Sequence, residues 1–182
     1  MEQKQTVTNR RLTTPRAAAV AGIVFSVLFI VSLVLIRAAV PVDPVDPGTW
    51  LAEKRQSVAL ALNLLPFAGI AFLWFIGVLR DRLGDYEDRF FATVFLGSGL
   101  LFLAMLFVSA AIATGILLRY AVLPGGPEAG IYAFGRMIVY QIVNLYAMKM
   151  AGVFMISICT VAFRTRIFPR WMSYLGYALA AL

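Results

Sequence analysis

Long apolar stretches separated by short polar connections dominate the pattern along this chain. Crossing a bilayer takes about 20 predominantly apolar residues at a rise of about 1.5 Å per residue. Four stretches meet this requirement and predict transmembrane helices at residues 17–37, 58–79, 90–118 and 136–163. A fifth stretch, residues 171–182, is too short to span. The pattern therefore predicts an all-α fold, a polytopic membrane helix bundle of four complete transmembrane helices plus the start of a fifth.

The two ends of the chain each allow two interpretations. Residues 1–16 form a basic tail before the first apolar stretch, as in a signal peptide. The apolar region of a signal peptide has only about 7–15 residues, however, and Arg37 stands where a small-residue cleavage site is expected, so we expect a retained helix. The fifth stretch either lies in the membrane interface or continues beyond Leu182. The uncapped ending Leu-Ala-Ala-Leu favours continuation.

The connections between the predicted spans are short, so neighbouring helices should be antiparallel and adjacent. In the first of them Asp-Pro occurs twice, which enforces extended backbone and stops a helix. The next helix is expected to begin at Trp50, outside the membrane, and to continue into the second span.

The distribution of basic residues predicts the orientation. Ten Lys or Arg residues lie in the N-terminal tail and the connections on the same side, five lie on the opposite side, and Lys149 lies within a span. Because cytoplasmic connections carry the excess of Lys and Arg, the N-terminus is expected in the cytoplasm. The net charge of +7 then reflects anchoring to an anionic membrane surface rather than binding of nucleic acid.

The amino-acid composition limits the chemical reactions and binding sites that this chain can support. The chain is 62% hydrophobic and 14% charged, far from the roughly 45–50% and 25% of soluble domains. It contains no His and one Cys, which leaves no common general base at neutral pH, no disulfide within the chain and no multi-thiolate metal site. We therefore expect no enzymatic activity, no cofactor and no metal.

Polar groups inside the predicted spans are the informative residues, because such groups are costly in a bilayer. Most lie on the fourth span. On a helical wheel of 100° per residue, Arg136, Tyr140, Asn144 and Gln141 fall on one arc, whereas Lys149 falls on the other side. Together with Asn63 of the second span, they form the candidate intramembrane polar site: Lys149, Asn144, Gln141, Arg136 and Asn63.

Lys149 allows several interpretations. A Lys at the centre of a membrane helix costs about 2.5–3.5 kcal/mol on insertion scales. Its side chain leans toward the helix N-terminus and could reach the outer interface or pair with a backbone carbonyl. The alternatives are a substrate pathway and a contact with another subunit or an acidic lipid.

Other residues are assigned packing or anchoring roles. Pro66 should kink the second helix, and Asn63 could bond a freed backbone group or reach Asn144 or Gln141. Small residues of the third span should permit close helix packing within the chain or between copies, and Trp residues should anchor at the interfaces. The packing residues are Gly97, Gly99, Ala111 and Gly115, and the anchors are Trp50, Trp74 and Trp171.

Two segments carry a family resemblance. Residues 16–25, Arg-Ala-Ala-Ala-Val-Ala-Gly-Ile-Val-Phe, and the segment from Phe163 to Trp171, followed by Gly176, resemble uncharacterised families of small polytopic membrane proteins of bacteria, particularly actinobacterial ones. In those families a basic turn ending in a Pro-Arg-Trp-like element leads into a further membrane helix. The resemblance implies a bacterial inner-membrane protein and no particular activity.

Two functions remain open. The first is a non-catalytic accessory or structural subunit that packs against lipids, other membrane proteins or a second copy of the chain. The alternative is a small transporter or channel for an anionic or lipidic substrate, with the polar site of the fourth helix lining its path. The missing catalytic chemistry and the small-residue faces favour the accessory function.

Overall fold

The computed structural model of the chain describes residues 14–43, 46, 48, 50–83, 89–122, 129–165 and 169–181, and helices make up nearly all of this part. Tail residues 1–13 of the predicted cytoplasmic segment lie outside this set. In chain order the helices are α1 (Thr14–Ala39), α2 (Leu51–Leu83), α3 (Arg89–Val122), α4 (Ala129–Gln141), η1 (Ile142–Ala147), α5 (Met148–Thr165) and α6 (Arg170–Ala181).

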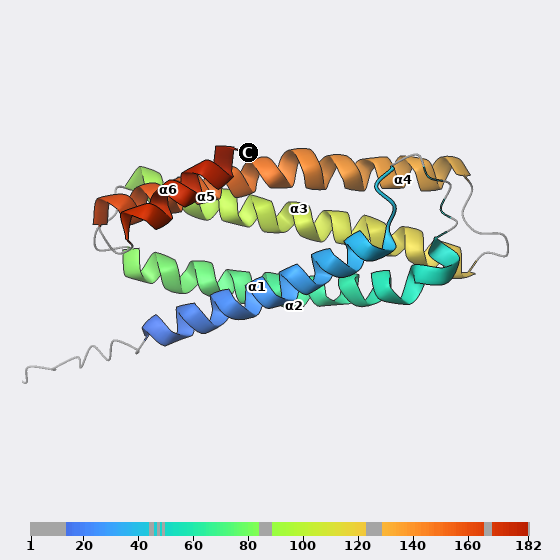
Figure 1. Cartoon of the computed structure of the whole chain (residues 1–182), viewed down its shortest axis with the longest axis horizontal. Coiled ribbons are helices and arrows are strands. Elements are labelled where there is room, and N and C mark those ends of the chain that lie inside the picture. The colour runs from blue at the N-terminus through green and yellow to red at the C-terminus, as the bar shows by residue number, and fades with distance from the viewer. Residues whose placement is uncertain are drawn as a thin grey trace, which may run out of the picture.

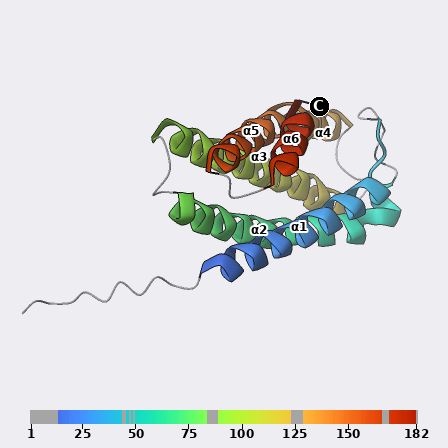
Figure 2. The ribbon, with the colours of Figure 1, turned by 60° about the vertical axis from the view of Figure 1, so that its left-hand side comes forward.

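The long helices run up and down in an antiparallel bundle, as the short connections predict (Figure 1). Each packs against its neighbours in the chain: α1 against α2, α2 against α3, α3 against α4, η1 and α5, and α5 against α6. Figure 2 shows α1 and α2 side by side, with α3 and α5 on the other side of the bundle. We call the end where α1 finishes and α2 begins the Trp50 end, and the opposite end the Arg164 end.

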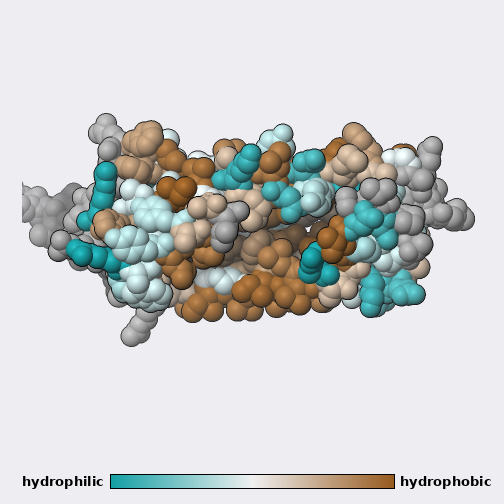
Figure 3. Space-filling model, turned by 45° about the horizontal axis from the view of Figure 1, so that its top comes forward, coloured by the Kyte–Doolittle hydropathy of each residue, from teal (hydrophilic) through white to brown (hydrophobic). Residues whose placement is uncertain are grey.

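Four helical segments are long and apolar enough to cross a membrane: Ala18–Ala39, Leu51–Arg80, Phe90–Ala121 and Gly130–Arg164. Large apolar side chains cover much of the surface, including Ile23, Phe67 and Trp74, which are 60–70% exposed. Contact of such an apolar surface with lipid chains is favourable, whereas its contact with water is not. On the face in Figure 3, apolar residues extend along the length of the bundle, with hydrophilic residues at both ends and a few in between. The protein is thus a multi-pass, all-α membrane protein.

Aromatic rings fill the middle of the bundle. Phe72 of α2 is almost fully buried and lies 4.7 Å from the ring of Phe25, 5.7 Å from that of Phe102 and 5.3 Å from that of Phe154. These contacts join α1, α2, α3 and α5. Aromatic pairs contribute about 0.5–1.5 kcal/mol each beyond the area that they bury. The cluster therefore ties all four spanning segments together at one level.

Glycine positions mark the closest approaches between helices, and Gly99 belongs to them as predicted. A Cβ atom at Gly99 would lie 2.7 Å from Cδ1 of Ile76 and 3.0 Å from a ring carbon of Phe154. Gly97 and Gly115 have open space where their Cβ atoms would be, and Ala111 is exposed.

Close packing also involves glycines that the sequence did not single out. Gly69 of α2 lies against the ring of Phe107 and a methyl group of Leu103, and Gly135 of α4 lies against the side chain of Ile116. These two contacts join α3 to α2 on one side and to α4 on the other. Helix α4 begins at Ala129, earlier than the predicted start of the span at residue 136, and it contains Gly135, where a residue of low helix propensity permits close packing.

The remaining bounds follow the predicted pattern with longer helices. α2 begins at Leu51, beside the predicted start at Trp50, and continues through Pro66. Residues Ile142–Ala147 are wound as a π-helix, which the sequence did not predict. α6 has 12 residues and packs on α5, where the hydroxyl groups of Tyr177 and Thr160 lie 2.8 Å apart.

Candidate binding cavity

A cavity of about 260 Å³ lies in the Trp50 half of the bundle. Its walls come from α1, α2, α3, α4 and η1, and the ring of Phe29 closes it toward the aromatic cluster. The cavity follows α1 from Phe29 to Val40, just after the end of the helix, a distance of eleven residue steps or roughly 16 Å at 1.5 Å per residue. The face drawn in Figure 3 is hollowed along its length between the helices.

The cavity exists because the bundle is unevenly packed. At the level of the aromatic cluster, Phe29 of α1 reaches Phe102 of α3, with 6.2 Å between the ring centres. Beyond that level α1 packs along α2 only, while α4 and η1 pack along α3. α1 and α4 thus do not pack along one another, although buried residues of α2, α3 and α4, among them Leu62, Leu117 and Tyr132, still form one cluster at the Trp50 end. The cavity lies between these helices, where the side chains leave space.

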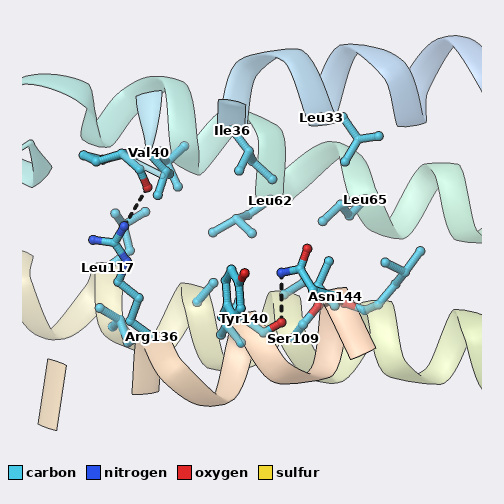
Figure 4. Close-up of a pocket in the computed structure, with 18 of the residues that line it drawn as sticks. Leu33, Ile36, Val40, Leu62, Leu65, Ser109, Leu117, Arg136, Tyr140 and Asn144 are labelled. Carbon is cyan, nitrogen blue, oxygen red and sulfur yellow. Dashed lines mark hydrogen bonds between the residues drawn. The ribbon is translucent and has the colours of Figure 1, made fainter. Parts of the chain in front are cut away.

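Apolar side chains form nearly all of the wall. Figure 4 shows Leu33 and Ile36 pointing in from α1, Leu62 and Leu65 from α2, and Leu117 from α3. Small residues of α3, Ala110 and Ala113, leave the space open. Such a wall offers no hydrogen bonds to water, and apolar cavities of this kind take up apolar molecules instead.

Tyr132 organises the polar groups at the mouth of the cavity. Its side chain is only 4% exposed, and its hydroxyl oxygen accepts hydrogen bonds from Nε1 of Trp50 at 3.1 Å and from the guanidinium of Arg136 at 2.8 Å. Gly48 makes room for the ring: its φ is +87°, and a Cβ atom there would lie 2.9 Å from the ring of Tyr132. The turn before α2 is thus shaped around this tyrosine.

Arg136 joins the opposite sides of the mouth. Besides Tyr132, it donates a hydrogen bond of 2.7 Å to the carbonyl oxygen of Pro41, which follows α1 (Figure 4). One of its nitrogens lies 3.8 Å from Oδ1 of Asp46, and the side chains are 11% and 24% exposed. That oxygen also accepts the amide hydrogen of Gly48 at 2.8 Å. The carboxylate therefore partly balances the charge of Arg136 without a direct hydrogen bond to it.

Asn144 lines the cavity farther from the mouth, on the π-helical segment, and its side chain is exposed. Its Nδ2 donates to the carbonyl oxygen of Tyr140 at 2.9 Å, and the hydroxyl of Ser109, across the cavity on α3, donates to the carbonyl of Leu106 at 2.8 Å. π-helical turns interrupt α-helices frequently at functional sites. Here the interruption lies where η1 lines the cavity through Val143 and Asn144.

The residues of the predicted polar site divide into two groups. Arg136 and Asn144 line the cavity together with Tyr140. Asn63, Gln141 and Lys149 are exposed on the surface and do not line it, and Asn63 forms no hydrogen bond with Asn144. The helical wheel already placed Lys149 on the other face of its helix. The five residues of the predicted polar site were grouped because they lie at similar depths in the membrane, not because their side chains point in the same direction.

Several cavity residues were missing from the sequence prediction. Tyr132 and Asp46 carry the hydrogen-bonding network of the mouth, and Ala110 and Ala113 provide the space. The spacing of Tyr132, Arg136 and Tyr140, at four-residue intervals, was the available signal for one shared face. No local pattern could have brought Asp46 to Arg136, since that contact depends on the turn between α1 and α2.

The arrangement suits the binding of an amphiphilic molecule. No group of three or more His, Cys, Asp or Glu side chains that could hold a metal ion lies among the residues that the structure describes. The cavity combines a long apolar interior with hydrogen-bond donors at one end, which matches a molecule with an apolar chain and a polar end. Comparison with protein-family models, curated proteins and solved structures gave no match to this chain.

Proposed function

We propose that this protein is a non-catalytic accessory protein of the membrane that binds a single apolar chain of a lipid in the cavity of its Trp50 half. The observation that carries the proposal is the cavity of about 260 Å³ with an almost wholly apolar wall inside a membrane-spanning bundle. Its size limits the occupant. An apolar cavity of about 150 Å³ holds benzene, so 260 Å³ takes a chain of about ten carbon atoms.

Lipid chains have a direct route to this cavity. α1 and α4 face each other across it without packing along one another, so the opening between them faces the surrounding bilayer. A chain that leaves the bilayer for the cavity exchanges one apolar environment for another. Affinity then comes from packing against the wall and from the polar end rather than from the hydrophobic effect.

The proposal includes a location and an orientation. The excess of ten basic residues over five and the family resemblance support an inner bacterial membrane with the N-terminus in the cytoplasm. The Trp50 end, and with it the mouth of the cavity, then faces away from the cytoplasm. Partner subunits or a second copy of the chain would pack on the exposed apolar faces.

Transport of an anionic or lipidic substrate is the alternative function. It draws support from Arg136 and Asn144, which line the cavity. It loses support from Lys149, Gln141 and Asn63, which were expected to line the path and are exposed on the surface instead. The accessory function needs only the cavity itself, and we therefore favour it.

Fluorescence of Trp50 tests the proposal, since this side chain lines the cavity. Trp74→Phe and Trp171→Phe leave Trp50 as the only tryptophan, and the protein is placed in phosphatidylcholine nanodiscs. Decanol brominated at its second carbon, close to the hydroxyl end that lies beside Trp50, should quench Trp50 with a saturable component. Ala113→Phe, which fills the cavity, should abolish that component, and so should Ala110→Phe.

The matched control is Ala111→Phe, one position away from Ala110 on the exposed side of α3. It adds the same ring to the same helix and should leave the saturable quenching intact. Quenching that rises linearly in every variant, as for a quencher merely dissolved in the bilayer, would contradict the proposal.

A further inference from the structure

The polar groups at the mouth of the cavity favour one chemical class of lipid. This inference rests on the proposed function, because it concerns the polar end of the chain that the cavity binds. Donors dominate at the mouth: the guanidinium of Arg136 and the indole N–H of Trp50 both donate to the hydroxyl of Tyr132, which is itself a donor. Asp46 is the nearby acceptor with a charge.

The hydroxyl hydrogen of Tyr132 needs an acceptor. The oxygen already accepts from Trp50 and Arg136, which are donors only, so both bonds use its lone pairs. Among the described residues, no acceptor is in place for the hydrogen itself, although the side chain is 4% exposed. A buried donor without an acceptor is costly, and an oxygen of a ligand would satisfy it.

Arg136 is likewise incompletely paired. A guanidinium has five N–H donors, and within the described part of the chain it makes two hydrogen bonds, to Tyr132 and to the Pro41 carbonyl. The carboxylate of Asp46 stays 3.8 Å away, beyond hydrogen-bonding distance, while its oxygen is held by the amide of Gly48. An anion could approach more closely than Asp46 does, and charge-assisted hydrogen bonds to arginine are about twice as strong as neutral ones.

We propose that the cavity selects a single-chain amphiphile with an acidic end, a carboxylate or a phosphate monoester, whose oxygens bind Arg136 and accept the hydroxyl hydrogen of Tyr132. Asp46 competes with this ligand for Arg136 and weakens its binding. The chain lies along α1 toward Phe29. The cavity of 260 Å³ has room for one chain of about ten carbons, so a second chain would have to stay in the bilayer outside it.

Displacement of brominated decanol from the single-Trp50 protein tests this selection. Decanoate, decyl phosphate and decanol share one chain and differ in the polar end. The two anions should displace the quencher at concentrations about tenfold lower than decanol does. Inorganic phosphate, which has the charge without the chain, should displace little. Displacement by inorganic phosphate as effective as that by decyl phosphate would show a site for a free anion and overturn the proposal.

Two variants assign the selection to its residues. In Arg136→Gln, decanoate, decyl phosphate and decanol should bind with the same affinity, while brominated decanol still binds. Asp46→Asn should raise the affinity for both anions several-fold and leave decanol unchanged, and it keeps the test open should Arg136→Gln fail to fold. Arg119→Gln, an exposed arginine of α3 that does not line the cavity, is the control and should retain the selection.

The outcomes separate the two proposals. Saturable quenching by brominated decanol without preference for the anions contradicts the acidic end and leaves the binding of an apolar chain intact. An unchanged anion preference in both Arg136→Gln and Asp46→Asn also contradicts it. Absence of saturable quenching in the unsubstituted cavity overturns the proposed function itself.

Discussion

The guanidinium of Arg136 donates a hydrogen bond of 2.7 Å to the carbonyl oxygen of Pro41, which precedes it by 95 residues. This bond connects the chain leaving α1 to α4, two segments that lie on opposite sides of the cavity and do not otherwise pack along one another. One basic side chain thereby does two things at the mouth. It holds the first connection in place, and it supplies a positive charge beside an apolar interior.

Replacing Arg136 should weaken the fold at this end. Arg136→Gln removes the hydrogen bonds to Pro41 and Tyr132, and bonds from a charged donor contribute about 1.5–3 kcal/mol each when their partners stay buried. We expect a lower temperature of thermal unfolding in nanodiscs, followed by circular dichroism. Arg119→Gln removes an exposed arginine and should change it little. Equal effects of the two substitutions would mean that the network at the mouth does not stabilise the fold.

Gly99 and Gly97 form a matched pair on α3. A leucine at Gly99 would overlap Ile76 and Phe154 in the core, which should cost about 1–3 kcal/mol of stability. Gly97→Leu places the same side chain in open space and replaces a residue of low helix propensity, so it should be neutral or stabilising. Thermal unfolding of the two variants measures the difference. If Gly97→Leu were the more destabilising of the two variants, the face of α3 that contacts α2 and α5 would be the one with Gly97 and not the one with Gly99.

The hydroxyl pair Thr160 and Tyr177 fixes α6 on α5. Because the hydroxyl hydrogen of Thr160 goes to the carbonyl of Ile156 at 2.8 Å, Tyr177 is the donor to Thr160, also at 2.8 Å. A double-mutant cycle of Thr160→Val and Tyr177→Phe should give a coupling energy of about 0.6 kcal/mol, the average for hydrogen bonds between membrane helices. Purely additive effects on unfolding would indicate that the two hydroxyl groups do not meet.

Lys149 separates the accessory function from transport. Its side chain is exposed on the outside of the bundle and does not line the cavity. Lys149→Met should leave the saturable quenching of Trp50 unchanged, and it should favour membrane insertion by about 2.5–3.5 kcal/mol. A loss of binding, or of a substrate flux measured in proteoliposomes, at unchanged thermal stability would instead support the transport alternative.

Much of the architecture followed from the sequence because it depends on local composition. Apolar length predicted four spanning helices, and the Asp-Pro turn predicted a helix start beside Trp50, where α2 begins at Leu51. The arc of Arg136, Tyr140 and Asn144 also reappears on the wall of the cavity, since four-residue spacing places side chains on one helix face.

Relations between distant segments could not be predicted in the same way. Apolar residues that face lipid and those that face a helix have the same composition, so Gly97 and Gly99 looked equivalent although only Gly99 is packed. The cavity arises between α1 and α4, which do not pack along one another, and no single stretch encodes this arrangement. The same holds for the approach of Asp46 to Arg136.

The position of a bound chain tests the central claim most directly. Crystals of the protein grown with terminally brominated decanol would show the bromine by its anomalous scattering. The account predicts one dominant peak inside the cavity, between Leu33 of α1 and Leu65 of α2, toward Phe29, which disappears in Ala113→Phe. Peaks confined to the outer surface of the helices, with the same pattern in Ala113→Phe, would contradict it.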